Sequence, residues 1–226
     1  KFFHEILMDN AMVGANFKIA NKYSLKYIIS GFNDSTEGIK IPDNWNWFKK
    51  DKKNIKNINR RFNNYKIKTF PAIGTIDYIY YRFIKNIKWI SPLNYLEYNK
   101  EKALKDLKTK FGFQEYPYKH YESIFTRFYQ GYLLPKKFNV DKRKLHLSNL
   151  IITNQISRIE AVEIMKQEPY NENDIKNDIN YFLKKLNWDN EKLNQYLNEK
   201  EIPHYLYGSE KNLWIFFTKL FKLFNS

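Results

Sequence analysis

The pattern of apolar and polar positions along the chain predicts helices separated by a few short strands. Apolar residues recur at helical spacing through residues 2–23, and a β-branched run at 26–30 follows directly. A helix that leads straight into an apolar strand is one step of a parallel sheet, and residues 27–29 suit a strand buried in such a sheet. Residues 66–70 alternate and predict another strand, and residues 88–93 predict a last short one.

Between these strands the pattern predicts further helices. Residues 49–65 have apolar groups at only three positions and otherwise carry many lysines and arginines. This predicts a helix with a solvated basic face, with phosphate contact as the alternative. Residues 75–87 predict an aromatic-rich helix. The other segments of this half are an irregular loop at 39–48 and a helix at 100–110 that Asn99 caps.

The chain beyond residue 150 has a helical pattern throughout. Ser157 and Glu160 have the spacing of a capping box, which predicts a helix reaching to about residue 167. The last helix is strongly apolar and basic. We expect it to dock on the core, with a dimer contact or a membrane-surface anchor as alternatives. The predicted helices of this region after the capping box are at 171–186, 189–199 and 211–224.

These elements predict an α/β fold in two parts. The α/β part covers residues 1–95 and contains a parallel sheet, and residues 96–226 form an all-α region for substrate binding or interaction. No apolar run approaches the about 20 residues of a membrane-spanning helix. The absence of cysteine excludes disulfides and thiolate metal sites, and it agrees with a cytoplasmic location.

The net charge of +15 favours anionic partners. The chain has 39 basic and 24 acidic residues, and such a surplus attracts nucleotides, sugar phosphates, nucleic acid or anionic lipid. The same surplus is expected from coding sequence rich in A and T, because lysine, asparagine, isoleucine and tyrosine are all abundant here. Charge alone therefore does not choose a function.

A polar segment follows the first predicted strand and contains the first candidate site. Gly31 can adopt backbone angles that allow a sharp turn, and ligands in open α/β sheets bind beyond the carboxyl ends of the strands. Asn33, Asp34 and Glu37 supply hard oxygen atoms of the kind that Mg²⁺ prefers. The alternative is an ordinary polar turn after a strand.

The second candidate site lies in residues 119–148. On a helix from 121 to 133, Ser123, Arg127 and Gln130 fall on one face and aromatic residues on another. This pattern suits either a helix that lines a site or an ordinary amphipathic helix. Further on, Asp141 stands at a predicted helix start, and the three cations behind it could bind a phosphate.

Residues 119–148, with Gln155 and Arg158 beyond them, resemble the C-terminal signature of the N-acetyl sugar amidotransferases. That family belongs to the PP-loop ATP pyrophosphatase superfamily. The resemblance covers roughly residues 10–168. The other segments that carry it are 30–38, 68–71 and 77–83.

The resemblance implies a fold, an activity and partners. The fold would be the C-terminal part of a parallel-sheet adenine-nucleotide-binding domain of the PP-loop (HUP-like) type, followed by the all-α region. Such enzymes use ATP and Mg²⁺ to convert an acetamido group of a UDP- or CMP-linked sugar into an acetamidino group. A separate glutaminase subunit supplies ammonia, and the products enter surface glycans such as LPS O-antigen and flagellin glycans. No nucleic-acid partner is implied, and a homo-oligomer is compatible with the family.

The resemblance also implies roles for individual residues. Glu37 would be a ligand of Mg²⁺, and Gly31, Asn33 and Asp34 would lie against the nucleotide. His120, Glu122 and Gln130 would orient the amide or the incoming ammonia, with His120 as a candidate general base. The catalytic group also includes Arg127. The cations that would contact phosphates are Lys119, Arg127, Lys142 and Arg143.

The sequence departs from the family pattern at three places. A phosphate-binding loop of the type Ser-Gly-Gly-x-Asp-Ser is absent, and so is a cysteine-rich N-terminal segment. Residues 116–118 read Tyr-Pro-Tyr where the family tends to have glycines. We therefore expect the chain to be part of a longer protein that begins upstream of Lys1.

Two other functions compete with the amidotransferase hypothesis. A PP-loop enzyme that modifies RNA, such as a tRNA thiolase, would also be basic and would also activate a carbonyl by adenylation. A non-catalytic helical interaction module is the third possibility. The amidotransferase hypothesis makes a geometric prediction, namely that Glu37 and Arg127 line one pocket.

Overall fold

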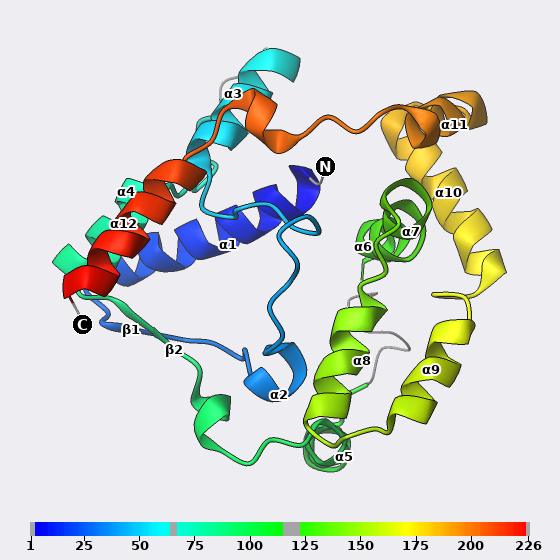
Figure 1. The fold of residues 1–226 in the computed structure, drawn as a ribbon, viewed down its shortest axis with the longest axis horizontal. Coiled ribbons are helices and arrows are strands. Elements are labelled where there is room, and N and C mark those ends of the chain that lie inside the picture. The colour runs from blue at the N-terminus through cyan, green and yellow to red at the C-terminus, as the bar shows by residue number, and fades with distance from the viewer. Residues whose placement is uncertain (1–2, 64–66, 115–122, 225–226) are drawn as a thin grey trace. The chain divides into compact units, whose positions relative to one another are not determined.

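The computed structural model describes residues 3–63, 67–114 and 123–224 and divides into two compact units (Figure 1). Unit 1 contains residues 1–30, 42–91 and 201–226, and unit 2 contains residues 31–41 and 92–200. These units differ from the predicted ranges of 1–95 and 96–226. The segment after the first strand packs with unit 2, and the C-terminal helix packs with unit 1.

Unit 1 contains a small parallel sheet. Strand β1 (Tyr27–Ile29) pairs with β2 (Lys88–Ile90), and Ile28 lies opposite Trp89. The prediction of two parallel strands is confirmed. The prediction that both faces of the first strand are buried is wrong, because Tyr27 and Ile29 are exposed and only Ile28 is buried. Elsewhere in the described ranges the chain is mostly helical and adds no third strand, so the larger sheet of a PP-loop domain is not seen.

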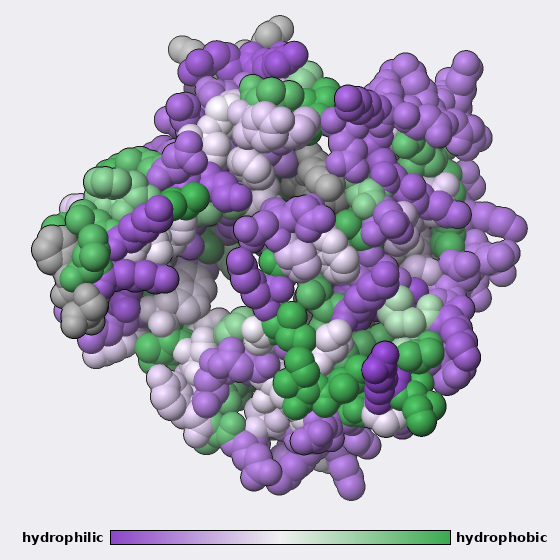
Figure 2. Space-filling view, in the orientation of Figure 1, coloured by the Kyte–Doolittle hydropathy of each residue, from purple (hydrophilic) through white to green (hydrophobic). Residues whose placement is uncertain are grey.

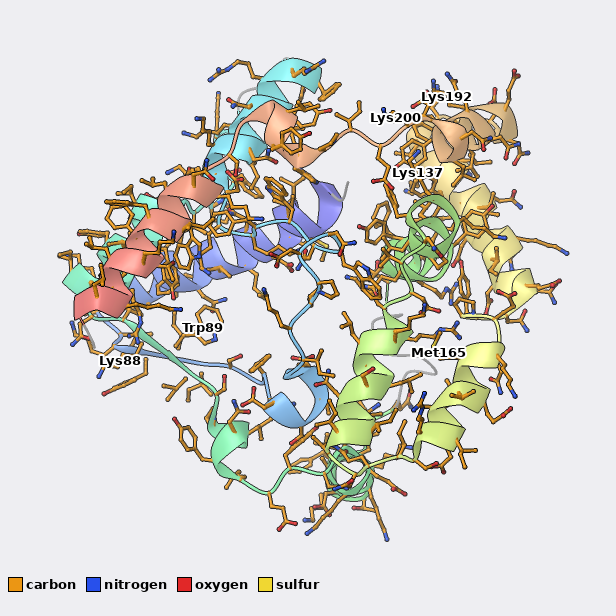
Figure 3. All side chains as sticks on the ribbon, viewed as in Figure 1. Lys88, Trp89, Lys137, Met165, Lys192 and Lys200 are labelled. Carbon is orange, nitrogen blue, oxygen red and sulfur yellow. The ribbon has the colours of Figure 1, made fainter. Side chains whose placement is uncertain are left out.

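The core of unit 1 lies between the sheet and α1 (Phe3–Lys22). Phe17 of α1 is fully buried, stacks on Tyr81 at 5.5 Å and lies 5.8 Å from the ring of Trp89. Trp89 therefore belongs to the face of β2 that meets the helix, and Lys88 beside it is exposed (Figure 3). This alternation is the period of two that a strand with one buried face requires.

The strand predicted at residues 66–70 is wrong over its described part, because residues 67–70 are irregular. The segment that follows them makes backbone hydrogen bonds with a side chain and not with a neighbouring strand. The carboxamide of Asn10 accepts from the Ile73 amide at 3.0 Å and donates to the Ile73 carbonyl at 2.7 Å. A Cβ at Gly14 would collide with the Pro71 carbonyl oxygen, so a glycine on α1 lets the segment pass close by.

The helices predicted at 49–65, 75–87 and 211–224 are confirmed in unit 1, and η4 was not predicted. The aromatic-rich segment forms an α-helix that continues as a π-helical turn. The C-terminal helix docks on this pair, because Phe83 stacks on Phe221 at 4.3 Å and Tyr78 meets Trp214 at 5.3 Å. The elements are α3 (Lys52–Phe62), α4 (Thr75–Ile79), η1 (Tyr80–Ile84), η4 (His204–Tyr207) and α12 (Lys211–Phe224).

Two carboxylates join the C-terminal segment to the starts of α3 and α4. Asp51 is fully buried and accepts from the backbone amides of Asn54 and Glu210. The carboxylate of Glu210 in turn accepts from the amides of Lys53 and Thr75. Negative groups at two helix N-termini satisfy amides that have no partner within the helices.

Unit 2 is all-α, as predicted for most of this region. Its predicted caps are confirmed: Asn99 caps α5, Gly112 ends it with a φ of +64°, and Ser157 and Glu160 form the capping box of α9. The elements are α2 (Asp34–Glu37), η2 (Pro92–Tyr95), α5 (Lys100–Phe111), α6 (Ile124–Phe128), η3 (Tyr129–Leu133), α7 (Leu134–Phe138), α8 (Arg143–Ile152), α9 (Arg158–Lys166), α10 (Glu172–Leu186) and α11 (Asn190–Asn198).

An aromatic contact and a lysine hold several of these helices together. Phe128 of α6 is fully buried and lies 4.6 Å from the ring of Phe182 on α10. Lys137 of α7 donates to the carbonyls of Tyr196 and Glu199 at the end of α11 (Figure 3). A cation at a helix C-terminus satisfies carbonyls that the helix leaves without partners.

Candidate functional site

The polar segment after β1 forms the short helix α2. Asn33 caps it, because its side-chain oxygen accepts from the amide of Thr36 at 2.9 Å and from the Thr36 hydroxyl at 3.0 Å. Asn33 is buried, whereas Asp34 and Glu37 are exposed. Gly31 does not use the backbone freedom of a glycine: its φ is not positive, and a Cβ there would meet no described atom within 4 Å.

Hydrogen bonds fix α2 to the second half of α8. The hydroxyl of Thr153 donates to the Ser35 carbonyl at 3.1 Å, and the Ile39 amide donates to the side chain of Asn149 at 2.9 Å. The Asp34 amide donates to the side chain of Asn94 at 2.8 Å. The acidic turn therefore has a fixed place against α8 even though its carboxylates face outward.

The first turn of α8 carries the predicted cation cluster. The acid expected at the helix start is confirmed, because Asp141 accepts from the Arg143 amide at 2.9 Å. The guanidinium of Arg143 pairs with Asp141 at 2.7 Å and donates to the Gln167 carbonyl at 2.8 Å. Arg143 thus joins the start of α8 to the end of α9. Lys142 beside it is half-buried, and Lys144 is exposed.

Arg127 on α6 is held by a carboxylate of α10. Its Nε and Nη2 donate to the two oxygens of Asp178, each at 2.7 Å. Asp178 is buried, and this hydrogen bond raises the pKa of Arg127. The ring of Tyr170 lies 5.6 Å from the guanidinium carbon. An ion pair of this kind has first of all a structural role, because it joins two helices.

Gln130 lies on the π-helical turn η3. The Leu134 amide bonds to the Tyr129 carbonyl five residues back, and Pro135, which has no amide proton, follows at once. The wider turn breaks the predicted face of Ser123, Arg127 and Gln130, and Ser123 is the cap of α6. Gln130 is half-buried, and its side chain makes no hydrogen bond to any other described residue.

The structure therefore places the predicted residues of unit 2 in separate groups. Glu37 lies with the second half of α8, whereas Arg143 lies in its first turn. The ten residues of α8 span about 15 Å. Arg127 and Gln130 lie on α6 and η3. Lys119, His120 and Glu122 fall outside the described residues.

The single pocket predicted for Glu37 and Arg127 does not coincide with either of two cavities in the described chain. One of those lies between α4, η1 and α12 of unit 1, and the other lies on α5 of unit 2. Neither is lined by a predicted site residue. The shared pocket stays a prediction.

The residues that the structure describes do not by themselves form a metal cluster for Mg-ATP. Over the described ranges, no group of three or more His, Asp or Glu side chains could hold a metal ion. Mg²⁺ in a nucleotide site takes one or two carboxylate ligands beside phosphate oxygens and water. Glu37 could supply one of these carboxylates. Arg127 and Arg143 are paired with carboxylates, and the glycine-rich phosphate loop is absent from the sequence.

Several residues that shape this region were not found from the sequence. Asp178 is 51 positions from Arg127, so no local pattern pairs them. Asn94 and Asn149 stand among apolar residues, and their partners Asp34 and Ile39 are 60 and 110 positions away, so no local pattern pairs them either. The one available signal was Pro135, which marks the place where helical hydrogen bonding must change.

Comparison with known proteins links the second half of the chain to one family. Residues 122–221 match the family described as LPS biosynthesis protein WbpG-like, C-terminal domain. The matched part runs from the start of α6 into α12 and agrees with the C-terminal portion of an amidotransferase-family protein, as the sequence resemblance implied. No curated protein and no solved structure matched the chain.

Proposed function

We propose that this chain, whose residues 122–221 are similar to the C-terminal domain of WbpG-like LPS biosynthesis proteins, belongs to an ATP-dependent amidotransferase of surface-glycan biosynthesis. The observation that carries the proposal is this family match. It falls on the same part of the chain as the amidotransferase signature in residues 119–148. The substrate would be a UDP- or CMP-linked N-acetyl sugar, and a glutaminase subunit would supply ammonia.

The proposed reaction explains why a nucleotide is needed. The oxygen of an acetamido group is a very poor leaving group, and transfer of AMP to that oxygen with loss of pyrophosphate makes it a good one. Ammonia then adds at the carbon, and AMP leaves with the oxygen, so the acetamido group becomes an acetamidino group. Water must be kept away from the activated amide, because hydrolysis would restore the starting sugar.

Within unit 2 we assign phosphate contact to the first turn of α8. Lys142 and Lys144 flank Arg143 there, at the helix end that carries the partial positive charge of the backbone. Arg143 is already bonded to Asp141 and to α9, and so it would position this turn. Arg127 is likewise already paired, with Asp178, and so it would position α6. Glu37 remains our proposed ligand of Mg²⁺.

Binding measurements distinguish this function from RNA modification. Isothermal titration with UDP- and CMP-linked N-acetyl sugars should detect binding, and thermal unfolding should shift upward because a ligand of the native state stabilises it. The double variant Lys142→Ala/Lys144→Ala should weaken this binding. Lys176→Ala, an exposed lysine on α10, is the control and should bind as the unaltered chain does.

Transfer RNA is the competing ligand in the same assay. Tight binding of tRNA that falls steeply with salt, together with no response to any sugar nucleotide, would overturn the proposal in favour of an RNA-modifying enzyme. Equal sugar-nucleotide binding by the double variant and the control would remove the assignment of Lys142 and Lys144.

A further inference from the structure

The C-terminal helix α12 has two apolar faces, and only one of them is used within unit 1. The first face meets α4 and η1 through Trp214, Phe217 and Phe221, and the stacking of Phe221 on Phe83 lies at its centre. The second face is open. Leu213, Phe216 and Leu223 have exposed fractions of 39%, 59% and 74%.

These exposed residues form a stripe together with Leu220, which is half-buried. At 3.6 residues per turn, Leu213, Phe216, Leu220 and Leu223 fall within about 80° of one another around the helix. Phe83, which stacks on Phe221, and Ile84 on the neighbouring π-helical turn are also exposed. Figure 2 shows hydrophobic colours gathered over α12 and α4. We call the stripe and these two residues the apolar face of unit 1.

A groove lies against the inner face of α12, and none of the four stripe residues lines it. It has a volume of about 320 Å³ and lies between α4, η1 and α12. Its walls are aromatic and aliphatic, and the cations Arg82 and Lys222 are among its lining residues. Within the described part of the chain, neither Arg82, Lys219 nor Lys222 pairs with a carboxylate. Cations that have no carboxylate partner, beside an apolar helix, suit the anionic head group of a lipid.

Positive charge is concentrated in the same unit. Unit 1 has 19 basic and 7 acidic residues, a net charge of +12, whereas unit 2 has 20 basic and 17 acidic residues, a net charge of +3. Unit 1 therefore carries four fifths of the charge of the chain. A field of this strength attracts an anionic surface over the Debye length and orients the unit toward it.

We propose that unit 1 docks through this apolar face on an anionic lipid surface. The stripe of α12 enters the boundary between head groups and acyl chains, and Arg82, Lys219 and Lys222 contact lipid phosphates. No helix in the described part of the chain is long and apolar enough to cross a membrane. The helix thus lies in the plane of the interface, as basic amphipathic helices do.

The apolar stripe favours lipid over the other occupants. Nucleic acid would be held by the lysines and gains little from exposed leucines, because its backbone contacts are electrostatic. A second copy of the chain would bring two units of charge +12 together at the contact, and like charges across an interface cost binding energy. A bilayer of anionic lipid matches both the apolar stripe and the charge.

Vesicle sedimentation tests the proposal with the full chain. The protein should pellet with vesicles of phosphatidylcholine and phosphatidylglycerol, and it should stay in solution with vesicles of phosphatidylcholine alone. Raising the salt should weaken the binding because salt screens the charges. The variant Phe216→Ser/Leu223→Ser should lower the apparent affinity at least about tenfold, since it removes two buried apolar side chains from the lipid contact.

Matched controls distinguish binding through the stripe from nonspecific hydrophobic binding and from misfolding. Ile152→Ser/Ile159→Ser changes two residues that are 68% and 76% exposed in unit 2 and should leave binding unchanged. Lys219→Gln/Lys222→Gln should weaken binding, and Lys184→Gln/Lys185→Gln on α10 should not. Circular dichroism checks that every variant is folded.

Several results would overturn the proposal. One is equal pelleting with neutral and anionic vesicles, and another is unchanged binding by the Phe216→Ser/Leu223→Ser variant. A concentration-dependent dimer that this variant abolishes would assign the stripe to a second copy. Release from vesicles by tRNA, with tRNA binding unaffected by the variant, would assign the charge to nucleic acid.

Discussion

The guanidinium of Arg127 and the carboxylate of Asp178 bind each other at two points, with Nε–Oδ2 and Nη2–Oδ1 both at 2.7 Å. This ion pair joins α6 to α10 and uses the residue that the sequence indicated as a phosphate contact. The side chain of Asp178 is only 3% exposed, whereas that of Arg127 is 22% exposed. The pair is therefore asymmetric, and its two halves should respond differently to substitution.

Arg127→Ala should destabilise unit 2 by about 3 kcal/mol, because it leaves the buried carboxylate of Asp178 without its partner. Asp178→Asn should cost less, since the guanidinium can reach water. Urea unfolding measures both. Glu163→Ala breaks an exposed pair with Lys166 and should change the free energy of unfolding by less than about 1 kcal/mol. Equal, small effects of all three variants would contradict a structural role for the pair.

Asn10 should be among the most sensitive polar positions of unit 1. Its side chain is fully buried and satisfies the carbonyls of Lys49 and Ile73 and the amide of Ile73. Asn10→Ala leaves these groups buried without a partner and should cost about 3 kcal/mol or more in urea unfolding. Asn16→Ala is the control on the same helix, because Asn16 is exposed and its side chain donates to the Met12 carbonyl of its own helix. Its effect should be close to zero.

Stability should fall with acid through His204. Burial lowers the pKa of this residue to about 3, and the charge of Lys49 acts in the same direction. The unfolded chain takes up a proton below its ordinary pKa of 6.5 while the folded chain does not. The folded state therefore loses up to about 1.4 kcal/mol per pH unit as the pH falls from 6.5 toward 3.

The variant His204→Asn isolates this effect. The imidazole Nδ1 lies 3.1 Å from the side-chain oxygen of Asn54, whose amide group donates to two carbonyls, so Nδ1 carries the proton. An asparagine amide can replace that donor and does not titrate. Unfolding experiments over the same pH range should show a shallower decline for the variant, and parallel curves would refute the assignment.

Two glycines should behave in opposite ways. Gly14→Ala places a Cβ against the Pro71 carbonyl and should destabilise unit 1 by more than about 2 kcal/mol. Gly31→Ala meets no described atom and needs no unusual φ, so stability should change by less than about 0.5 kcal/mol. If Gly31 lies against a nucleotide, as proposed, its variant should lose activity while staying folded. Full activity of Gly31→Ala would remove that role.

The sequence predicted the elements whose causes are local. Capping side chains lie within three residues of the amides that they satisfy, so Asn99 and Ser157 marked helix starts correctly. The parallel pairing of the two strands followed from the helix that precedes β1. The spacing of apolar residues also predicted α12 correctly. The face of α12 that carries Trp214 and Phe221 packs on the rest of unit 1, as expected.

The errors came from contacts that are distant along the chain. Residues 67–70 alternate like a strand, yet the segment they lead into is paired by a side chain of α1, 63 positions away at Asn10 and Ile73. The predicted helix from 121 to 133 was treated as one regular α-helix, but Pro135 accompanies a π-helical turn that shifts Gln130. Arg127 was predicted to contact a ligand because nothing in the sequence around Asp178 marks that residue as its partner.

A metal role for Glu37 has a simple test in the gene product that contains this chain. Glu37→Gln keeps the size of the side chain and its place at the end of α2, where it is exposed. Loss of a ligand of Mg²⁺ should reduce amidine formation by at least about tenfold, partly recovered at high Mg²⁺, because the metal offsets phosphate charge. Unchanged turnover would remove the assignment, and Asp43→Asn serves as the exposed control.

Mass spectrometry of the sugar nucleotide tests the central claim most directly. The gene product that contains this chain is incubated with ATP, Mg²⁺, an ammonium salt and a UDP- or CMP-linked N-acetyl sugar. The proposed function predicts that the acetamido oxygen is replaced by an imino group and that AMP and pyrophosphate appear in equal amounts. Sugar nucleotides that stay unchanged across both carriers, with no AMP formed, would contradict it.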